Sequence, residues 1–357
     1  MSQTPRRLAI VLFNLGGPDR PEAVRPFLFN LFNDPAIIRL PWPLRPLLAT
    51  LISRRRAKAA TAIYEELGGG SPLLENTRAQ AAALEAALRE QAGAEAVEAR
   101  CFIAMRYWHP MAMETAQAVK DWAPDQIVLL PLYPQFSTTT TASSARVWRE
   151  AAKAVGLAAP ESLVCCYPID AGFVEAMAAL IAPRYRAARQ AAGRARILFS
   201  AHGLPEKIVK AGDPYQWQCE RTNEAIVARL SDLVDEPAPD WVNCYQSRVG
   251  PLAWIGPSTE AEVARAGADQ VGCVVVPMAF VSEHSETLVE LDIEYRDLAR
   301  EKGVPAYERV PTVAADAGFI AGLARLALAG TTRSGTASMT GGRLCPADWS
   351  GCPCRTA

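Results

Sequence analysis

The sequence has almost no net charge, few histidines and no long apolar run. Its 37 basic and 38 acidic residues give a formal charge of -1, so it has no overall electrostatic field that would attract nucleic acid. The longest uncharged run, residues 126–145, contains prolines and consecutive threonines, which argue against a membrane-spanning helix. The N-terminus lacks a small-residue cleavage site, so no signal peptide is expected and the protein is predicted to be cytoplasmic.

A disulfide framework is not expected either. In a cytoplasmic protein the nine cysteines are predicted to be thiols or metal ligands. Half of the 357 residues are hydrophobic, which predicts a sizeable core and enough chain for two domains.

Short aliphatic runs alternate with longer stretches of helical period. This rhythm predicts an α/β fold with parallel sheets flanked by helices. Ligands of such sheets bind beyond the carboxyl ends of the strands. The predicted strands are residues 8–14, 100–105, 126–133, 162–167, 196–200, 240–245 and 271–277.

The chain repeats itself. VLFNLGGP at 11–18 is similar to ILFSAHGLP at 197–205, and DQIVLLPLYPQFS at 125–137 is similar to DQVGCVVVPMAF at 269–280. The two halves therefore predict an internal duplication of βα units. The two members of the first pair lie further apart in the sequence than those of the second pair, so the first half must carry extra residues. We place this insertion at about residues 35–75.

These patterns predict the domain limits. The first domain covers residues 1–168 and the second covers residues 169–330. Residues 331–357, which begin with small residues of low complexity, are interpreted as a linker and a cysteine-containing tail, so the folded core is expected to end near residue 329.

The insertion contains an apolar stripe at helical spacing that leads into a basic cluster. One interpretation is a helix packed on the core with a solvated basic end. The other is an apolar lip with cationic anchors, suited to a large flat acidic ligand or to peripheral contact with the inner membrane. The stripe is Leu44, Leu47, Leu48, Leu51 and Ile52, and the cluster is Arg54, Arg55, Arg56 and Lys58.

The segment FVSEHSETLVELDIEY, residues 280–295, places acids at four-residue spacing. Glu286, Glu290 and Glu294 would form one row on a helix capped by Ser282. One interpretation is a solvated acidic face. The other is a row that binds a divalent cation or moves protons, at the carboxyl edge where His202 of SAHGLP also lies.

Seven motifs in this order closely resemble the ferrochelatase family, whose members insert ferrous iron into protoporphyrin IX to make protohaem. The resemblance implies two Rossmann-like domains with a porphyrin cleft between them, the chelatase-like fold. It implies protoporphyrin IX and ferrous iron as substrates, in a monomer or a homodimer. The motifs are FNLGGP, YEELGGGSPL, RYWHP, PLYPQFSTTT, SAHGLP, NCYQSRVGPLAW and FVSEHSETLVELDIEY.

The resemblance also implies roles for individual residues. His202 matches the active-site histidine and Glu286 its partner acid across the porphyrin, and both are expected to meet the iron. His284 matches the neighbouring histidine, and Glu290 continues the acidic path outward. The residues expected to line the macrocycle or hold its propionates are Leu15, Arg56, Tyr64, Ser71, Arg106, Tyr133 and Trp254.

The tail contains three cysteines, Cys345, Cys352 and Cys354, spaced C-x6-C-x-C. Some ferrochelatases hold a [2Fe–2S] cluster with C-terminal cysteines and one cysteine from the body of the protein, and this tail resembles theirs. Four thiolates are required, so Cys166 or its neighbour Cys165 is expected to supply the fourth. A zinc site and free thiols are the competing interpretations.

Other functions compete with iron insertion into protoporphyrin. One is a chelatase of coproporphyrin or sirohydrochlorin. Another is a non-catalytic protein that binds haem or another tetrapyrrole, and a third is an iron–sulfur sensor whose functional part is the tail. The pair of His202 and Glu286 favours catalysis, because a carrier does not need a base and an acid at the ring.

Overall fold

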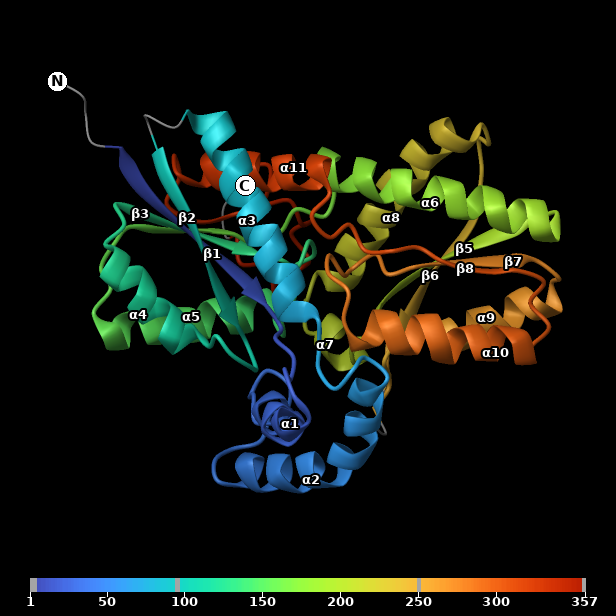
Figure 1. The fold of residues 1–357 in the computed structure, drawn as a ribbon, viewed down its shortest axis with the longest axis horizontal. Helices are drawn as coiled ribbons and strands as arrows, with labels where there is room; N and C mark the ends of the chain where they lie inside the picture. Colours follow the sequence, from blue (N-terminus) through green and yellow to red (C-terminus); the bar gives the residue numbers. More distant parts are fainter. Residues whose placement is uncertain (1–4, 94–96, 249–251, 355–357) are drawn as a thin grey trace. The chain divides into compact units, whose positions relative to one another are not determined.

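The computed structural model describes residues 5–93, 97–248 and 252–354. The chain divides into two units (Figure 1). Unit 1 consists of Met1–Cys166, Leu323–Leu344 and Pro353–Ala357, and unit 2 consists of Tyr167–Gly322 and Cys345–Cys352. None of the helices in the described ranges combines the length and apolarity that crossing a bilayer requires.

Unit 1 is built on a parallel sheet with the strand order β2-β1-β3-β4-β9. Its central strands bury almost every side chain, as expected for a parallel sheet covered by helices on both faces. The strands are β1 (Arg6–Asn14), β2 (Val97–Met105), β3 (Gln126–Pro131), β4 (Glu161–Val164) and β9 (Gly335–Ala337).

Helices cover both faces of this sheet (Figure 1). α4 (Ala112–Trp122) and α5 (Thr141–Val155) pack on the face that presents Val11 and Phe13, and Trp148 fills the centre of that layer. α3 (Leu73–Ala92) and the end of α11 (Ala317–Gly330) cover the other face. Because alternate residues of β1 point to opposite faces, one strand supplies both cores.

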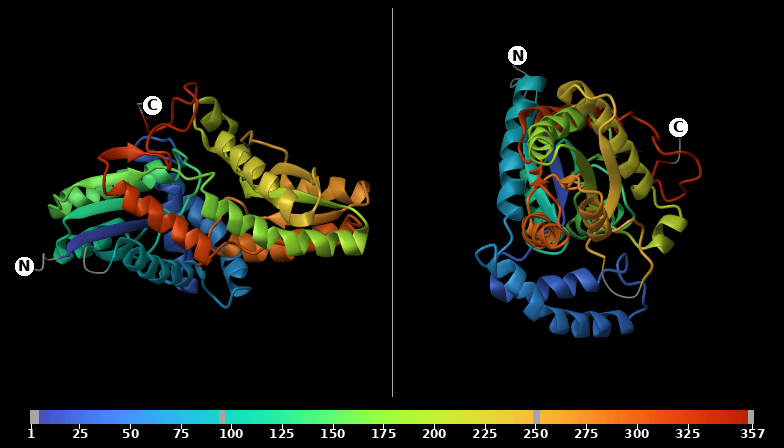
Figure 2. Two further views of the ribbon diagram at one scale, coloured as in Figure 1. Left: turned by 90° about the horizontal axis from the view of Figure 1, so that it is seen from above. Right: turned by 90° about the vertical axis from the view of Figure 1, so that its right-hand side faces the viewer.

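η1 (Pro21–Ala23) and α1 (Val24–Phe32) precede the predicted insertion at about residues 35–75, which holds α2 (Leu44–Glu65). In Figure 2, α1 and α2 are the blue helices that stand away from the sheet of unit 1. Three of the five side chains of the predicted apolar stripe face solvent, because Leu44, Leu47 and Leu51 are 54%, 67% and 45% exposed, whereas Leu48 and Ile52 are half-buried. The three exposed leucines form a surface lip.

Unit 2 has a four-stranded parallel sheet with the order β6-β5-β7-β8. α6 (Ala171–Ala192) and α8 (Tyr215–Val234) cover one face, and α9 (Thr259–Ala268), the π-helix η2 (Glu286–Glu294) and α10 (Tyr295–Glu301) cover the other (Figure 1). The strands are β5 (Ala195–His202), β6 (Asp240–Gln246), β7 (Gly272–Val276) and β8 (Tyr307–Arg309), and α7 (Glu206–Lys210) follows β5.

The predicted internal repeat is confirmed by the strand orders. β2-β1-β3-β4 in unit 1 corresponds to β6-β5-β7-β8 in unit 2, and the similar sequence pairs fall on β1 with β5 and on β3 with β7. In each sheet the order reverses between the first and third strands. Ligands of such sheets bind outside the carboxyl ends of the strands at this switch point.

The structure corrects the expectation that the folded core ends near residue 329. Residues Gly335–Ala337 form β9, which pairs in parallel with β4. The three tail cysteines are buried, Cys345 at 4%, Cys352 at 7% and Cys354 at 3% exposure. The small residues of this segment permit close packing, so low complexity did not mean a flexible linker.

Candidate active site

His202 and Glu286 come together in unit 2. His202 is the last residue of β5, and Glu286 is the first residue of η2, which follows β7. Because β5 and β7 are adjacent parallel strands, their carboxyl ends meet at one edge, at the switch point of the sheet. His202 Nδ1 lies 3.0 Å from Glu286 Oε2.

This contact corrects the expected placement of the pair. The resemblance implied that His202 and Glu286 lie across the macrocycle from one another. A flat ring between them would need about 7 Å, twice the separation of carbon atoms in contact. At 3.0 Å the two side chains must act from the same side, because both emerge from the same edge of one sheet.

The pair shifts the pKa values of its members in opposite directions. Burial alone would lower the pKa of His202, but the charge of Glu286 and its hydrogen bond outweigh burial and raise it above the ordinary value. Burial alone would raise the pKa of Glu286, yet the charge of His202 holds it well below the usual range. Each charge therefore stabilises the other: Glu286 stabilises the protonated form of His202 when it takes up a proton, and protonated His202 stabilises the Glu286 carboxylate.

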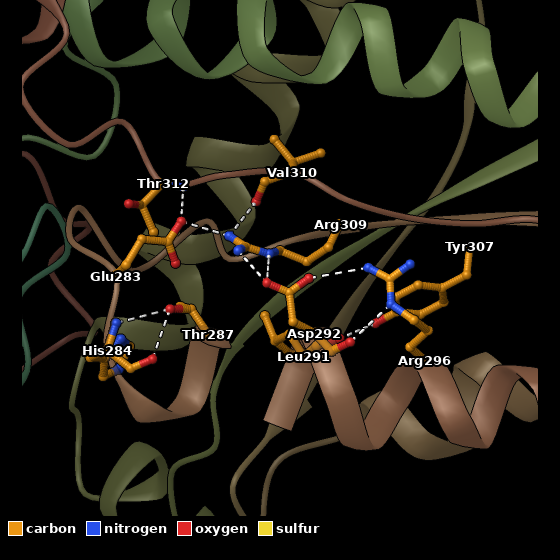
Figure 3. Close-up of polar contacts among 10 residues, drawn as sticks. All are labelled: Glu283, His284, Thr287, Leu291, Asp292, Arg296, Tyr307, Arg309, Val310 and Thr312. Carbon is orange, nitrogen blue, oxygen red and sulfur yellow. Dashed lines mark hydrogen bonds and ion pairs between the residues drawn. The ribbon is translucent and has the colours of Figure 1, made fainter. Parts of the chain in front are cut away.

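His284 is the second histidine of the cluster. Its ring is 8% exposed, lies 4.6 Å from the Phe280 ring between centroids, and places Nε2 3.8 Å from Glu286 Oε2. The hydroxyl of Thr287 accepts a hydrogen bond from the His284 backbone N–H at 3.0 Å (Figure 3). This local turn fixes the direction in which the histidine enters the helix.

Glu290 lies further along η2 and is held by several donors. Its oxygens accept hydrogen bonds from the Ser247 N–H at 2.8 Å, the Ser247 hydroxyl at 2.6 Å and the Tyr295 hydroxyl at 2.7 Å. Burial and the charge of Glu286 raise the pKa of Glu290 above its ordinary value, against the effect of these donors. Glu294, the third acid of the row, is exposed.

The helix that carries these acids differs from the expected one. It is a π-helix that begins at Glu286 after Ser285, rather than an α-helix capped by Ser282. Short π-helical stretches occur often at functional sites because their wider turn re-aims side chains. Four-residue spacing alone did not distinguish the two helix types.

Trp254 lies beside the His202 loop. Pro205 and Trp254 form an antiparallel bridge, and a Cβ atom at Gly203 would lie 3.2 Å from Cε3 of Trp254 and 3.0 Å from the Gln246 carbonyl oxygen. Glycine at 203 therefore permits a close approach of the loop to β6 and to the indole. The structure brings Trp254 to the site of unit 2.

In unit 1, Arg106 follows β2 and points to a buried carboxylate. Its Nη2 lies 2.6 Å from Asp34 Oδ2, and its Nε donates to the Ser143 hydroxyl at 2.8 Å. The Tyr107 hydroxyl donates to the same Asp34 oxygen at 2.8 Å. Burial alone would raise the pKa of Asp34, but the Ala36 N–H, Ser143 and Arg106 lower it. Arg106 is thus oriented by Asp34.

The other predicted substrate residues of unit 1 lie on several elements. Leu15 follows β1, and its carbonyl accepts the Tyr107 N–H at 2.9 Å. The Ser71 N–H donates to the Pro18 carbonyl at 2.7 Å, and a Cβ at Gly17 would lie 2.6 Å from the Ser71 side chain. Tyr64 is buried in the core of α1 and α2, Tyr133 follows β3 with its pKa raised by burial, and Arg56 lies exposed on α2.

The tail thiols make two sets of contacts. In unit 1, Cys165 Sγ lies 3.5 Å from Cys354 Sγ and 3.6 Å from Cys166 Sγ, near the edge of about 3.8 Å expected between sulfurs on a tetrahedral metal with 2.3 Å bonds. In unit 2, Cys345 Sγ accepts a hydrogen bond from Gln218 Nε2 at 3.1 Å. Within the described ranges no group of three or more His, Cys, Asp or Glu side chains is placed to hold a metal ion.

Sequence reasoning missed Asp34 and Arg309. Asp34 precedes a proline in LFNDPAII, where an aspartate is an ordinary turn former, so its burial left no signal. Arg309 lies on the three-residue strand β8, which is too short to show a strand pattern. For Arg309, the only available hint of a buried ion pair was an arginine next to the apolar residues of YERVP.

Comparisons with known proteins agree with this architecture. The model of the Ferrochelatase family matches residues 7–330. A relative from Phenylobacterium zucineum, named Ferrochelatase, is 56% identical over 349 residues and covers 98% of each chain. The relative of the same name from Caulobacter vibrioides (strain NA1000 / CB15N) is 54% identical over 351 residues, again with 98% of each chain covered.

A solved structure shares the fold. SirB from Bacillus subtilis with Fe3+ matches with a TM-score of 0.50 and 13% identity, over 90% of this chain and 93% of that one. At this identity the likeness concerns the fold alone. The expected fold of two parallel-sheet α/β domains flanked by helices is confirmed.

Proposed function

This chain belongs to the ferrochelatase family, enzymes of haem biosynthesis that insert ferrous iron into a porphyrin, and on that premise we propose that protoporphyrin IX is metalated at the His202 and Glu286 pair of unit 2. The observation that supports this site is the 3.0 Å contact between His202 and Glu286 at the switch point of the sheet. The porphyrin cleft between the two domains stays a prediction.

The chemistry requires a base. Metalation removes two protons from pyrrole nitrogens that are weakly acidic in water. Because His202 Nδ1 contacts Glu286, the other ring nitrogen, Nε2, is the atom that accepts a proton from the ring. Glu286 stabilises the imidazolium that forms, and the raised pKa of His202 makes it a stronger base than a free histidine.

The two carboxylates of η2 take different roles. The pKa of Glu286 is lowered and that of Glu290 is raised. When the pKa values of two neighbouring acids differ in this way, the acid with the lower pKa stays charged and the acid with the higher pKa can carry a proton. Glu286 stays ionised beside the histidines, where it also attracts ferrous iron as the substrate cation. The carboxylate of Glu290 accepts a proton that moves from the site toward solvent.

Residues of unit 1 bind the substrate in this proposal. Leu15 offers an apolar contact to the macrocycle, and Ser71 offers a hydroxyl. Arg106 supplies positive charge for a propionate, since its guanidinium is held in one direction by Asp34 at 2.6 Å. Arg56 lies on the exposed face of α2 and can meet a carboxylate that extends into solvent.

An anaerobic assay tests the function. Purified protein is given ferrous iron with protoporphyrin IX, coproporphyrin or sirohydrochlorin, and the absorption of the metalated product is followed. We expect turnover with protoporphyrin IX. Product only with another tetrapyrrole would identify another chelatase, and binding without product would identify a carrier.

The active-site assignment is tested by His202→Ala. The variant is expected to bind porphyrin normally, as followed by porphyrin fluorescence, and to lose about 10²–10⁴-fold in turnover, the usual contribution of general acid–base catalysis. Retained turnover would refute the role of His202. A matched control is His109→Ala, because His109 is an exposed histidine paired with Glu114.

We also propose that the protein holds a [2Fe–2S] cluster. Its predicted ligands are Cys345, Cys352, Cys354 and either Cys165 or Cys166, and the 3.5 Å contact of Cys165 with Cys354 supports a cysteine of the body as a partner of the tail. No step of the mechanism passes through the cluster. Visible charge-transfer absorption and bound iron in the purified protein, both lost in Cys354→Ser, would establish it.

Membrane contact is proposed for the lip. Leu44, Leu47 and Leu51 are exposed together, and the basic cluster that begins at Arg54 follows on the same helix. An apolar face beside cationic side chains is typical of helices that lie on anionic membranes. A second copy of the chain is the competing occupant, which would make the protein a homodimer.

A further inference from the structure

One arginine of an edge strand holds both ends of the segment that carries His284 and Glu286. Arg309 is the last residue of β8, and its side chain is 10% exposed. Its Nη1 lies 2.6 Å from Glu283 Oε1, before the π-helix, and its Nε lies 2.9 Å from Asp292 Oδ2, inside the π-helix (Figure 3). The residues between these two contacts are the catalytic segment 283–292.

The same strand makes a second tie. The Tyr307 hydroxyl donates to the Leu291 carbonyl of the π-helix at 2.6 Å, and Glu283 Oε1 also accepts the Thr312 N–H at 3.0 Å. β8 pairs with β7 in parallel, with Arg309 beside Val275. The segment is therefore fastened to the sheet whose carboxyl edge carries His202.

A guanidinium is suited to this task. Its donors lie in a rigid planar fork, so one side chain can bind two carboxylates at fixed directions. Lysine presents a single ammonium that cannot hold Glu283 and Asp292 in the same geometry. Glu283 and Asp292, which flank Glu286 and Glu290 in the sequence, thus support the acidic row through Arg309.

We propose that Arg309 is a positioning residue for metal insertion: by bracketing residues 283–292 it maintains the wide turn of the π-helix and keeps Glu286 in contact with His202. The inference rests on the proposed function of that pair. Arg309 acts through Glu283 and Asp292 and does not touch the substrate.

Energetics support a geometric role over a purely stabilising one. The Arg309 side chain is 10% exposed and its partners Glu283 and Asp292 are 21% and 27% exposed. Buried ion pairs often contribute little net stability, because desolvation offsets the attraction between the charges. The cluster does fix the direction of its side chains, since the three charged groups lie on β8, on the π-helix and on the loop before it.

The test uses Arg309→Lys in the full-length protein, with Arg184→Met as the matched control. Arg184 pairs at 3.2 Å with Glu308 on the same strand, and that pair holds no residue of segment 283–292. For Arg309→Lys we expect kcat for iron insertion to fall about 10- to 100-fold, as for a small displacement of reacting groups, while KM for porphyrin and the unfolding temperature stay close to the unaltered protein. The control should match the unaltered protein throughout.

The outcomes separate the two proposals. If the unaltered protein does not insert iron into a porphyrin, the proposed function fails. If it does and Arg309→Lys shows the same kcat, or a raised KM at unchanged kcat, the positioning role is overturned. If Arg309→Lys is not recovered folded, Tyr307→Phe decides in its place, because it deletes one hydroxyl: a lowered kcat at unchanged KM supports β8 as the positioning strand, and an unchanged kcat overturns it.

Discussion

Replacing Asp34 by Asn tests whether a buried carboxylate organises the substrate residues of unit 1. The Asp34 side chain is fully buried and accepts hydrogen bonds at 2.6 to 2.9 Å from Arg106, Tyr107, Ser143 and the Ala36 N–H. These donors come from the end of β2, the first turn of α5 and the chain after α1. One carboxylate thus joins three segments.

The magnitude follows from what the substitution leaves behind. Arg106 is only 13% exposed, so Asp34→Asn leaves its charge buried beside a neutral amide, and the loss of one partner from a buried pair costs about 3–5 kcal/mol. The amide oxygen can still accept from Tyr107 or Ser143, so the neutral hydrogen bonds add no more than about 1 kcal/mol. We expect a destabilisation of about 3 kcal/mol or more in unit 1.

Urea unfolding followed by fluorescence and circular dichroism measures this loss. Asp121→Asn is the matched control, because Asp121 is an exposed aspartate of α4 that accepts one hydrogen bond from Gln117, and it should cost less than about 0.5 kcal/mol. Adding Arg106→Gln to Asp34→Asn should cost less than the sum of the two single changes, since the unpaired charge is gone. Additive losses, or a cost below about 1 kcal/mol for Asp34→Asn, would refute the buried pair.

The stability that Asp34 contributes should be lost at low pH. The folded pKa of Asp34 lies below its unfolded value, because the donors outweigh burial. Its contribution to stability is therefore complete above the unfolded pKa of about 3.9 and is lost as the pH falls through the folded pKa. In Asp34→Asn this part of the acid sensitivity should be absent.

Three further changes test the site and the lip. Glu286→Gln should lower the pKa of His202, because it removes the larger of the two carboxylate charges that oppose burial and leaves only that of Glu290. The acid limb of the kcat–pH profile should therefore move to lower pH while kcat falls, and an unmoved limb would contradict the pair. Glu290→Gln should lower kcat about tenfold or more at unchanged porphyrin binding, and unaltered turnover would exclude Glu290 as a proton carrier. Leu47→Asp with Leu51→Asp should abolish flotation with anionic vesicles, whereas loss of a dimer in sedimentation would assign the lip to a second copy.

The strands and the repeat could be predicted from the sequence because their physical signal is local. The seven predicted runs of 5 to 8 residues became β1, β2, β3, β4, β5, β6 and β7, and the paired strings identified the central strands of both sheets. His202 was placed at the end of β5 by the same logic, since a polar residue directly after a buried run must lie at the strand's end.

What could not be predicted depends on contacts between distant residues. β8 and β9 have three residues each, so they exist only because β7 and β4 offer unpaired edges. The π-helix differs from an α-helix by one residue per hydrogen bond, and the spacing of Glu286 and Glu290 does not distinguish the two. The contacts of this helix with Arg309 and Tyr307 come from a strand that the sequence did not predict. The sequence likewise provides no measure of the distance between functional groups. The expected placement of His202 and Glu286 on opposite sides of the macrocycle was therefore wrong.

The strand orders explain why the acid–base chemistry can be assembled inside one unit. In unit 2 the switch point brings the end of β5 next to the segment after β7, so a base and its acid meet without any contribution from unit 1. The equivalent edge of unit 1 carries Leu15 after β1 and Tyr133 after β3, and neither side chain transfers protons at neutral pH. If the proposed roles hold, the two copies of one topology have different tasks: changes at the edge of unit 2 should act mainly on kcat, and changes at the edge of unit 1 mainly on KM for porphyrin.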